Sequence, residues 1–218
     1  MFKNLNFKVF VYVLVGLSLL LWYGIALVTG LDILKLGDIL RLLPKVVTAD
    51  LLLFFVFSKW GWKFKLFQGW LIPFPDLNGT WQGVIRTTWI NPETNERPEP
   101  IPVILTIKQT FTNLSCVMRT EEMASYSFAE DFKIDRDRQI KQLVYSYLSN
   151  PNLTIAERSP AHNGTIILDI IGNPANELRG QYWTARKTTG EVVLTFREKK
   201  LLDRMPKDLG RHPMAEVQ

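Results

Sequence analysis

Apolar residues crowd into the first third of the chain, whereas polar and apolar positions alternate over most of the remainder. The segment from Val9 to Leu31 runs for 23 residues without a charged side chain. At about 1.5 Å per residue, a helix of this length crosses a hydrocarbon core roughly 30 Å thick. The pattern therefore predicts a transmembrane helix.

A second apolar segment, Leu42 to Trp60, is also long enough to cross a membrane, but it carries Lys45 near its start and Asp50 inside. Two interpretations compete: a second span that returns through the bilayer, or a helix that lies on its surface. The uninterrupted apolar run 51–57 and the tryptophan- and lysine-rich stretch that follows favour the span, because such residues anchor helices at the membrane interface. Residues 1–74 are thus expected to form a two-helix transmembrane anchor.

Basic residues flank the two predicted spans on their outer sides, while the short connection between them mixes acids and bases. By the positive-inside rule, both termini and the rest of the chain then lie in the cytoplasm. A single cysteine, Cys116, leaves no intramolecular disulfide to form and requires no oxidising compartment. The flanking basic residues are Lys3, Lys8, Lys59, Lys63 and Lys65.

From Asp76 onward the period of the pattern is that of β-strands. Turn chemistry separates the strands, with Asn163-Gly164 and Thr189-Gly190 interpreted as tight-turn pairs. Eight sequential strands with mostly short connections predict an all-β, antiparallel up-and-down barrel of the lipocalin-like kind over residues 75–205, with a sandwich as the alternative. Residues 206–218 lack a periodic apolar pattern and are expected to form a flexible tail. The candidate strands are 79–90, 101–111, 113–121, 123–134, 139–148, 165–171, 178–187 and 191–197.

The seventh candidate strand places Tyr182, Thr184 and Arg186 on one face, since side chains two positions apart point the same way. If that face is solvent, the pattern is the ordinary outside of a sheet; if it is the interior of a closed barrel, it is a polar pocket. The other candidates for the pocket are Thr87, Trp89, Tyr145 and Tyr147. Alternation does not decide which faces point inward, because both are amphipathic. If Trp81 points inward at a closed end, Thr87 and Trp89 line the same interior.

Asp50 is an ionisable group inside a predicted span, which costs about 2.5 to 3.5 kcal/mol at the centre of the membrane. One hypothesis is that Asp50, with Thr48, faces other copies of the protein or a water-filled path once oligomers form. The alternative is that Asp50 lies shallow and pairs within its own chain, with Lys45 or Thr48.

Two stretches carry a resemblance to a known family: PDLNGTWQG at residues 75–83 and GQYWTAR at 180–186, the latter followed by Gly190. Together with the two predicted spans, they resemble the two-transmembrane, β-strand-rich effectors of CBASS anti-phage defence. The resemblance implies that the barrel is a cytoplasmic receptor for a cyclic oligonucleotide made by a cognate nucleotidyltransferase. It further implies that ligand binding promotes homo-oligomerisation, and that the spans then disrupt the bacterial inner membrane and kill the cell.

A cyclic dinucleotide offers two phosphates and two bases, so its pocket needs cationic donors together with aromatic or guanidinium planes. Arg186 could bind phosphate or stack on a base, Tyr182 could stack or donate a hydrogen bond, and Thr184 could donate to an oxygen of the ligand. The competing interpretation of Arg186 is that it stacks on Trp81 and seals the barrel end. For Tyr145 and Tyr147 the alternative interpretation is that they lie on the outer face of the sheet.

The sequence shows no catalytic constellation: no phosphate-binding glycine loop, no metal-ligand cluster, and no histidine close in sequence to Cys116. His162 in a loop and His212 in the tail are not expected to act as ligands or bases. We therefore expect a binding protein without cofactor or metal, with membrane lipid around its helices and no nucleic acid polymer as partner. Two alternative functions remain: a lipocalin-like, membrane-anchored carrier or sensor of an apolar ligand, and an envelope scaffold whose barrel binds only protein.

Overall fold

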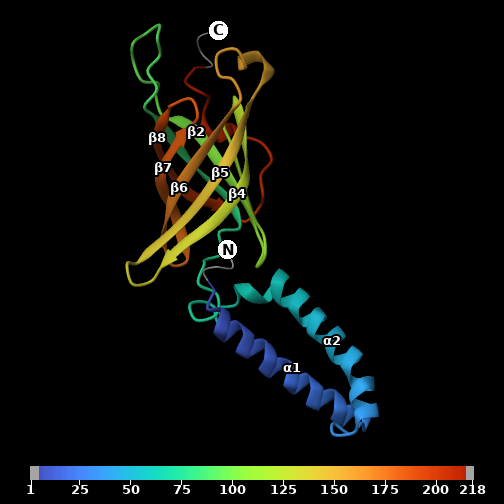
Figure 1. The fold of residues 1–218 in the computed structure, drawn as a ribbon. Coiled ribbons are helices and arrows are strands. Elements are labelled where there is room, and N and C mark those ends of the chain that lie inside the picture. The colour runs from blue at the N-terminus through green and yellow to red at the C-terminus, as the bar shows by residue number, and fades with distance from the viewer. Residues whose placement is uncertain (1–4, 215–218) are drawn as a thin grey trace. The chain divides into compact units, whose positions relative to one another are not determined.

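The structure is a computed structural model that describes residues 5–214. The chain divides into two compact units, shown in Figure 1. A helical unit comprises the residues up to 73 together with residues 110–112, and a barrel unit comprises residues 74–109 and the chain from 113 onward.

The helical unit contains α1 (Phe7–Thr29), α2 (Leu36–Lys59) and the short 3-10 helix η2 (Gly61–Lys63). The side chain of Asn6 caps the start of α1 by accepting a hydrogen bond from the Val9 amide. Gly30 ends the helix in the left-handed conformation, and its amide donates to the carbonyl of Ala26. Of the helices within residues 5–214, only α1 is long and apolar enough to cross a membrane by length and composition.

The second helix, α2, is long but carries five charged residues, so the second span is not established by the structure. Asp50 lies on α2, where its Oδ2 accepts a 2.8 Å hydrogen bond from Ser18 Oγ of α1. The hydroxyl of Thr48 donates instead to the carbonyl of Pro44, 2.8 Å away on its own helix. The own-chain partner of Asp50 is therefore Ser18 rather than Lys45 or Thr48. The five charged residues of α2 are Asp38, Arg41, Lys45, Asp50 and Lys59.

The barrel unit consists of eight antiparallel strands, each paired with the next, with the last returning to the first to close the barrel (Figure 1). This confirms the up-and-down barrel and rules out the sandwich. The strands are β1 (Gly79–Thr87), β2 (Ile101–Gln109), β3 (Leu114–Arg119), β4 (Met123–Asp135), β5 (Ile140–Pro151), β6 (His162–Gly172), β7 (Ala175–Thr184) and β8 (Thr189–Glu198). Two further 3-10 helices are η3 (Leu153–Ile155) and η4 (Lys207–Leu209).

Trp81 closes one end of the barrel. Its side chain is buried, its Nε1 donates to the carbonyl of Leu77 at 2.9 Å, and its ring meets Phe196 edge-on. Gln109 completes this end by accepting a 2.8 Å hydrogen bond from the Leu77 amide through its side chain. Burying large side chains such as these stabilises the fold by about 1.5 to 3 kcal/mol each. Because Trp81 points inward, the residues two, four and six positions further along β1 do so as well.

The C-terminal segment, whose residues 206–218 are predicted to form a flexible tail, contacts the barrel within the described residues. The amide of Leu202 donates to Thr80 Oγ1, Arg197 pairs with Asp208 at 3.0 Å, and His212 is buried. The hydrogen bond and the ion pair are polar, and the hydrogen bond joins residues far apart in the sequence, so no periodic apolar pattern predicts them. Residues 215–218, the rest of the predicted tail, lie outside the described residues.

Candidate ligand-binding cavity

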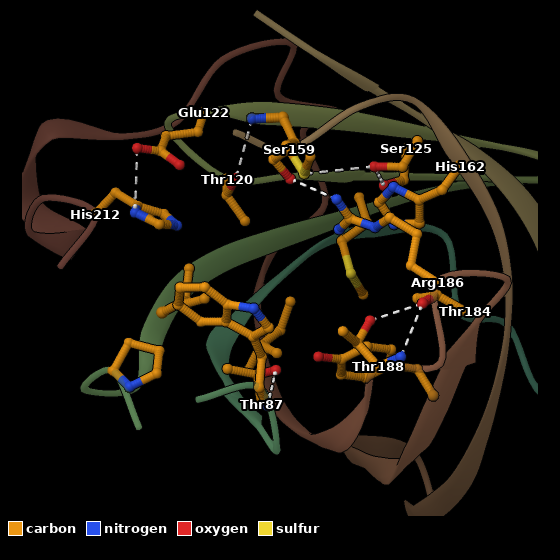
Figure 2. A pocket seen from close by; sticks show the side chains of 18 of the residues that line it. Thr87, Thr120, Glu122, Ser125, Ser159, His162, Thr184, Arg186, Thr188 and His212 are labelled. Carbon is orange, nitrogen blue, oxygen red and sulfur yellow. Dashed lines mark hydrogen bonds and ion pairs between the residues drawn. The ribbon is translucent and has the colours of Figure 1, made fainter. Parts of the chain in front are cut away.

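The end of the barrel remote from Trp81 opens into a cavity of about 400 Å³. Ligand pockets for small molecules typically measure about 300 to 1,000 Å³. The walls come from all eight strands, from the loops between them, and from the C-terminal segment. Figure 2 shows Glu122 and His212 on one side of this cavity and Arg186 and Thr184 on the other.

The structure shows which strand faces point into the barrel, which alternation alone did not decide. Six of the seven residues predicted for the pocket line the cavity: Thr87, Trp89, Tyr147, Tyr182, Thr184 and Arg186. Tyr145 also points inward but lies in the core, fully buried, so the outer-face alternative is wrong for both tyrosines of β5. Within the described part of the chain, its phenol oxygen has no hydrogen-bond partner, and burial raises its pKa well above the ordinary value.

The sequence pattern placed Arg186 in the seventh strand, and this was wrong. Arg186 belongs to the turn between β7 and β8. β7 ends at Thr184, whose hydroxyl lies 2.6 Å from that of Thr188 across the turn. Arg186 lies in this turn, and its Nη1 donates a 2.9 Å hydrogen bond to Ser159 Oγ. Because Trp81 closes the opposite end of the barrel, the alternative that Arg186 stacks on Trp81 is wrong.

The two tyrosines of the cavity each lie across from a glycine on the neighbouring strand. Tyr147 pairs with Gly164, and a Cβ at that glycine would stand 2.5 Å from the tyrosine ring. Tyr182 pairs with Gly190, where a Cβ would stand 2.6 Å from its ring. Burial raises the pKa of both phenols, so both are neutral hydroxyls able to donate hydrogen bonds at neutral pH. The Tyr182 hydroxyl bonds to the side chain of Thr87.

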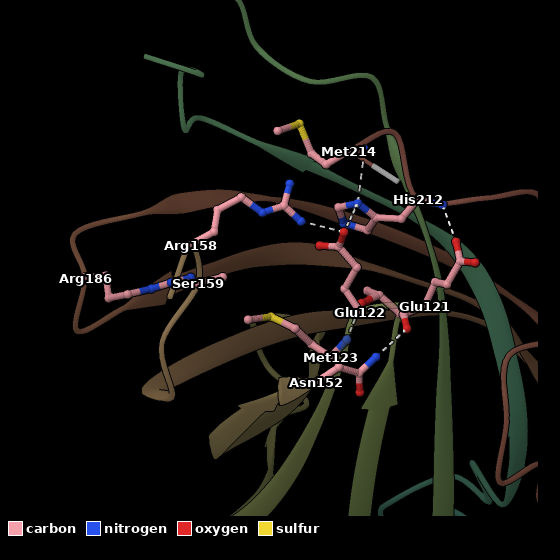
Figure 3. A network of polar contacts seen from close by, with 10 residues as sticks. Glu121, Glu122, Met123, Asn152, Arg158, Ser159, Arg186, His212 and Met214 are labelled. Carbon is pink, nitrogen blue, oxygen red and sulfur yellow. Dashed lines mark hydrogen bonds and ion pairs between the residues drawn. The ribbon is translucent and has the colours of Figure 1, made fainter. Parts of the chain in front are cut away.

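A second polar group in the cavity was missed by sequence reasoning (Figure 3). Arg158 Nη2 lies 2.6 Å from Glu122 Oε1, and His212 Nδ1 lies 3.4 Å from the same oxygen. Glu121 holds the tail by accepting a 2.7 Å hydrogen bond from the His212 amide. These residues come from the β3–β4 turn, the β5–β6 loop and the C-terminal segment. None of the three segments has a periodic pattern, so no signal in the sequence brings them together.

Both histidines, which were not expected to act as ligands or bases, line this cavity. Burial lowers the pKa of His162 and of His212, which leaves both rings neutral at pH 7. Burial also raises the pKa of the Cys116 thiol, which is inert for that reason. Among residues 5–214, no group of three His, Cys, Asp or Glu side chains could hold a metal ion.

The cavity thus combines cations with aromatic planes and hydroxyls. Two guanidinium groups supply charge-assisted donors for an anionic ligand. Two phenol rings and the indole of Trp89 offer planes on which a base can stack. The arrangement suits a small ligand that is both anionic and aromatic.

The fold and the cavity together define a closed β-barrel of the small-ligand-binding type, preceded by a helical unit. Residues 72–196 match the family described as "Cap15, cyclic dinucleotide receptor domain". The match covers more than half of the chain, and the chain belongs to this family. It is also 27% identical to "CD-NTase-associated protein 15" of Staphylococcus schleiferi over 179 aligned residues. This alignment covers 82% of this chain and 91% of that protein. The family resemblance drawn from the two motifs is confirmed.

Proposed function

We propose that this chain is a membrane-anchored effector of CBASS anti-phage defence whose barrel binds a cyclic dinucleotide. The observation that carries the proposal is the convergence of Arg186, Tyr147 and Tyr182 on one cavity of about 400 Å³. The family description, a cyclic dinucleotide receptor domain, supports the class of ligand. The name of the relative supports a nucleotidyltransferase as the source of that ligand.

In this cavity one phosphate and the bases of the ligand have matching groups. Arg186 binds a phosphate, exchanging its hydrogen bond to Ser159 for a stronger charge-assisted one. Tyr182 and Trp89 stack on a base or hydrogen-bond to its edge. The barrel acts as a receptor and not as an enzyme, and it needs no cofactor. The carrier alternative is less well supported, because Arg186 lines the cavity with a neutral hydroxyl, that of Ser159, as its hydrogen-bond partner, and an apolar ligand would leave its charge uncompensated.

In this proposal the helices disrupt the membrane when the barrel binds its ligand. α1 and α2 both span the bacterial inner membrane, with the termini and the barrel in the cytoplasm. Ligand binding promotes assembly of several copies, and the assembled helices disrupt the membrane and kill the cell. The length and apolar character of α1 support the first span. For α2, the hydrogen bond from Ser18 supports the second span, because it satisfies part of the hydrogen-bonding capacity of Asp50 inside the bilayer.

Isothermal calorimetry on the full-length protein in detergent tests the receptor. Titration with the 3′,3′-linked cyclic dinucleotides of all pairs of the four ribonucleotides should find at least one that binds. Arg186→Ala should weaken that binding roughly 10- to 100-fold, because a hydrogen bond to a charged group contributes about 1.5 to 3 kcal/mol.

Arg179→Ala is the matched control. Arg179 lies in β7, the strand that precedes the Arg186 turn; it is exposed and pairs with Glu177, so its loss should leave the affinity unchanged. Absence of binding to every member of the panel would overturn the receptor proposal. Equal affinities in the two variants would instead assign Arg186 a structural role only.

A further inference from the structure

The ion pair between Arg158 and Glu122 lies in the wall of the cavity and has no role in the function proposed so far. The two charged groups are 2.6 Å apart; the Glu122 side chain is 13% exposed and the Arg158 side chain 38% exposed. Both line the same cavity as Arg186. Figure 3 shows the pair between the turn that carries Arg186 and the tail that carries His212. The guanidinium therefore reaches both the cavity and the solvent at its rim.

The charges around this pair make Arg158 the main cationic partner of Glu122. His212 Nδ1 lies 3.4 Å from the carboxylate, but its ring is buried and neutral at pH 7. The amide of Met214 donates to that same Nδ1, so this nitrogen is an acceptor in the neutral ring. Glu121, the other acid of the turn, is occupied by the amide of His212. A second anion that approached Arg158 would compete directly with Glu122.

The two arginines of the cavity meet at the β5–β6 loop. Arg158 and Ser159 are consecutive in the β5–β6 loop; Arg158 bonds to Glu122, and Ser159 accepts from Arg186. Each guanidinium thus has a protein oxygen where a ligand oxygen could bind. A cyclic dinucleotide carries two phosphates, and Arg186 accounts for only one of them.

We propose that Arg158 is the second phosphate-binding residue of the cavity, and that the carboxylate of Glu122 occupies its anion subsite when no ligand is bound. This inference rests on the proposed receptor function. It adds that binding exchanges the Arg158–Glu122 ion pair for an Arg158–phosphate pair. Glu122 then competes with the ligand phosphate for Arg158 and lowers the affinity for the ligand.

Calorimetry on full-length variants in detergent, with a cyclic dinucleotide from the panel above that binds the wild type, tests the exchange. Arg158→Ala should weaken binding about tenfold or more through the lost charge-assisted hydrogen bonds. Glu122→Gln removes the competing charge and should tighten binding several-fold. In the Arg158→Ala background, Glu122→Gln should have no further effect, because the two residues act through one contact.

Arg158→Lys is the second variant at this position, and it should give intermediate affinity because it keeps the charge but loses the planar donor pair. The matched control is the exposed pair Arg138 and Asp135, 3.8 Å apart in the β4–β5 turn; Arg138→Ala and Asp135→Asn should not change the affinity. Thermal unfolding of each variant separates lost binding from lost folding.

The outcomes distinguish this inference from the receptor function. If the wild type binds and Arg186→Ala weakens binding, but Arg158→Ala, Arg158→Lys and Glu122→Gln all match the control pair, the second subsite is wrong while the receptor stands. If Glu122→Gln weakens binding, Glu122 supports the site instead of competing for it, and the proposed exchange is overturned. If the wild type binds no member of the panel, both proposals fall.

Discussion

Thr184 is the residue on which the position of Arg186 depends. Its hydroxyl lies 2.6 Å from the hydroxyl of Thr188 and accepts a 3.3 Å hydrogen bond from the Thr188 amide. Its carbonyl accepts from Lys187, which has the left-handed backbone angle φ 62° that closes the turn. The hydroxyl that the sequence suggested as a donor to ligand is therefore engaged within the chain. We expect Thr184 to position Arg186 in addition to lining the cavity.

Thr184→Val tests this positioning role with almost no change in shape. Without the hydroxyl, the turn loses the hydrogen bonds between the Thr184 side chain and Thr188. The free energy of unfolding should therefore fall by about 1 to 3 kcal/mol. Cyclic dinucleotide affinity should fall several-fold, since Arg186 is no longer held in place. Calorimetry and thermal unfolding measure the two effects.

Thr165→Val is the matched control for that experiment. The Thr165 hydroxyl lies 3.0 Å from Ser146 Oγ, and neither residue lines the cavity. This variant should lose similar stability while keeping its affinity for ligand. Equal affinities in Thr184→Val and Thr165→Val would contradict the positioning role of Thr184.

At the scale of elements, two glycines shape the aromatic wall of the cavity. Gly164 and Gly190, interpreted from sequence as turn residues, belong to β6 and β8. The ring of Tyr147 lies over the first and that of Tyr182 over the second, in the space that a Cβ would fill. An aromatic ring that covers a cross-strand glycine restores the packing that the glycine lacks. Gly164 is explained by the tyrosine beside it, and Gly190 by its tyrosine together with the carbonyl of Arg86, which a Cβ would approach to 2.4 Å.

Gly164→Ala should therefore displace Tyr147. All three atoms nearest to the added Cβ belong to that ring, at 2.5 to 2.9 Å, so the ring must move while the backbone need not. We expect several-fold weaker binding of cyclic dinucleotide by calorimetry. In a Tyr147→Ala background the glycine substitution should have little further effect, because the displaced ring is gone. An undiminished affinity in Gly164→Ala would show that the position of Tyr147 does not matter to the ligand.

The sequence was sufficient for the strands but not for the loops that complete the cavity. Alternation predicted eight strands, because it is a local pattern, whereas closure was inferred from the edges that an open sheet would expose, with a sandwich as the alternative. The inward face could not be derived from the same pattern; it is set by burial of Trp81 at the closed end, which depends on contacts with Leu77 and Phe196. Arg158 and His212 lie in aperiodic segments, so only the closed barrel brings them to Glu122.

At the scale of the whole molecule, Asp50 connects the proposed receptor to the proposed membrane response. The carboxylate accepts one hydrogen bond from Ser18, whereas an ionised carboxylate has about four acceptor positions. An acid left with unused acceptor capacity in a bilayer gains free energy if other copies of the chain or water supply donors. Assembly on ligand binding would provide them.

Asp50→Leu should insert normally, since it removes the costly polar group, and yet lose the response to ligand. The measurement is uptake of a membrane-impermeant dye by bacteria that express the chain and produce its cyclic dinucleotide, with immunoblots of the membrane fraction to confirm insertion. Ser18→Ala separates the two roles of the acid, because it removes only the hydrogen bond within the chain. If Asp50 acts in the assembly, Ser18→Ala retains dye uptake and Asp50→Leu abolishes it. Equal loss in both variants would restrict Asp50 to pairing the two helices, and full uptake in Asp50→Leu would remove it from the mechanism.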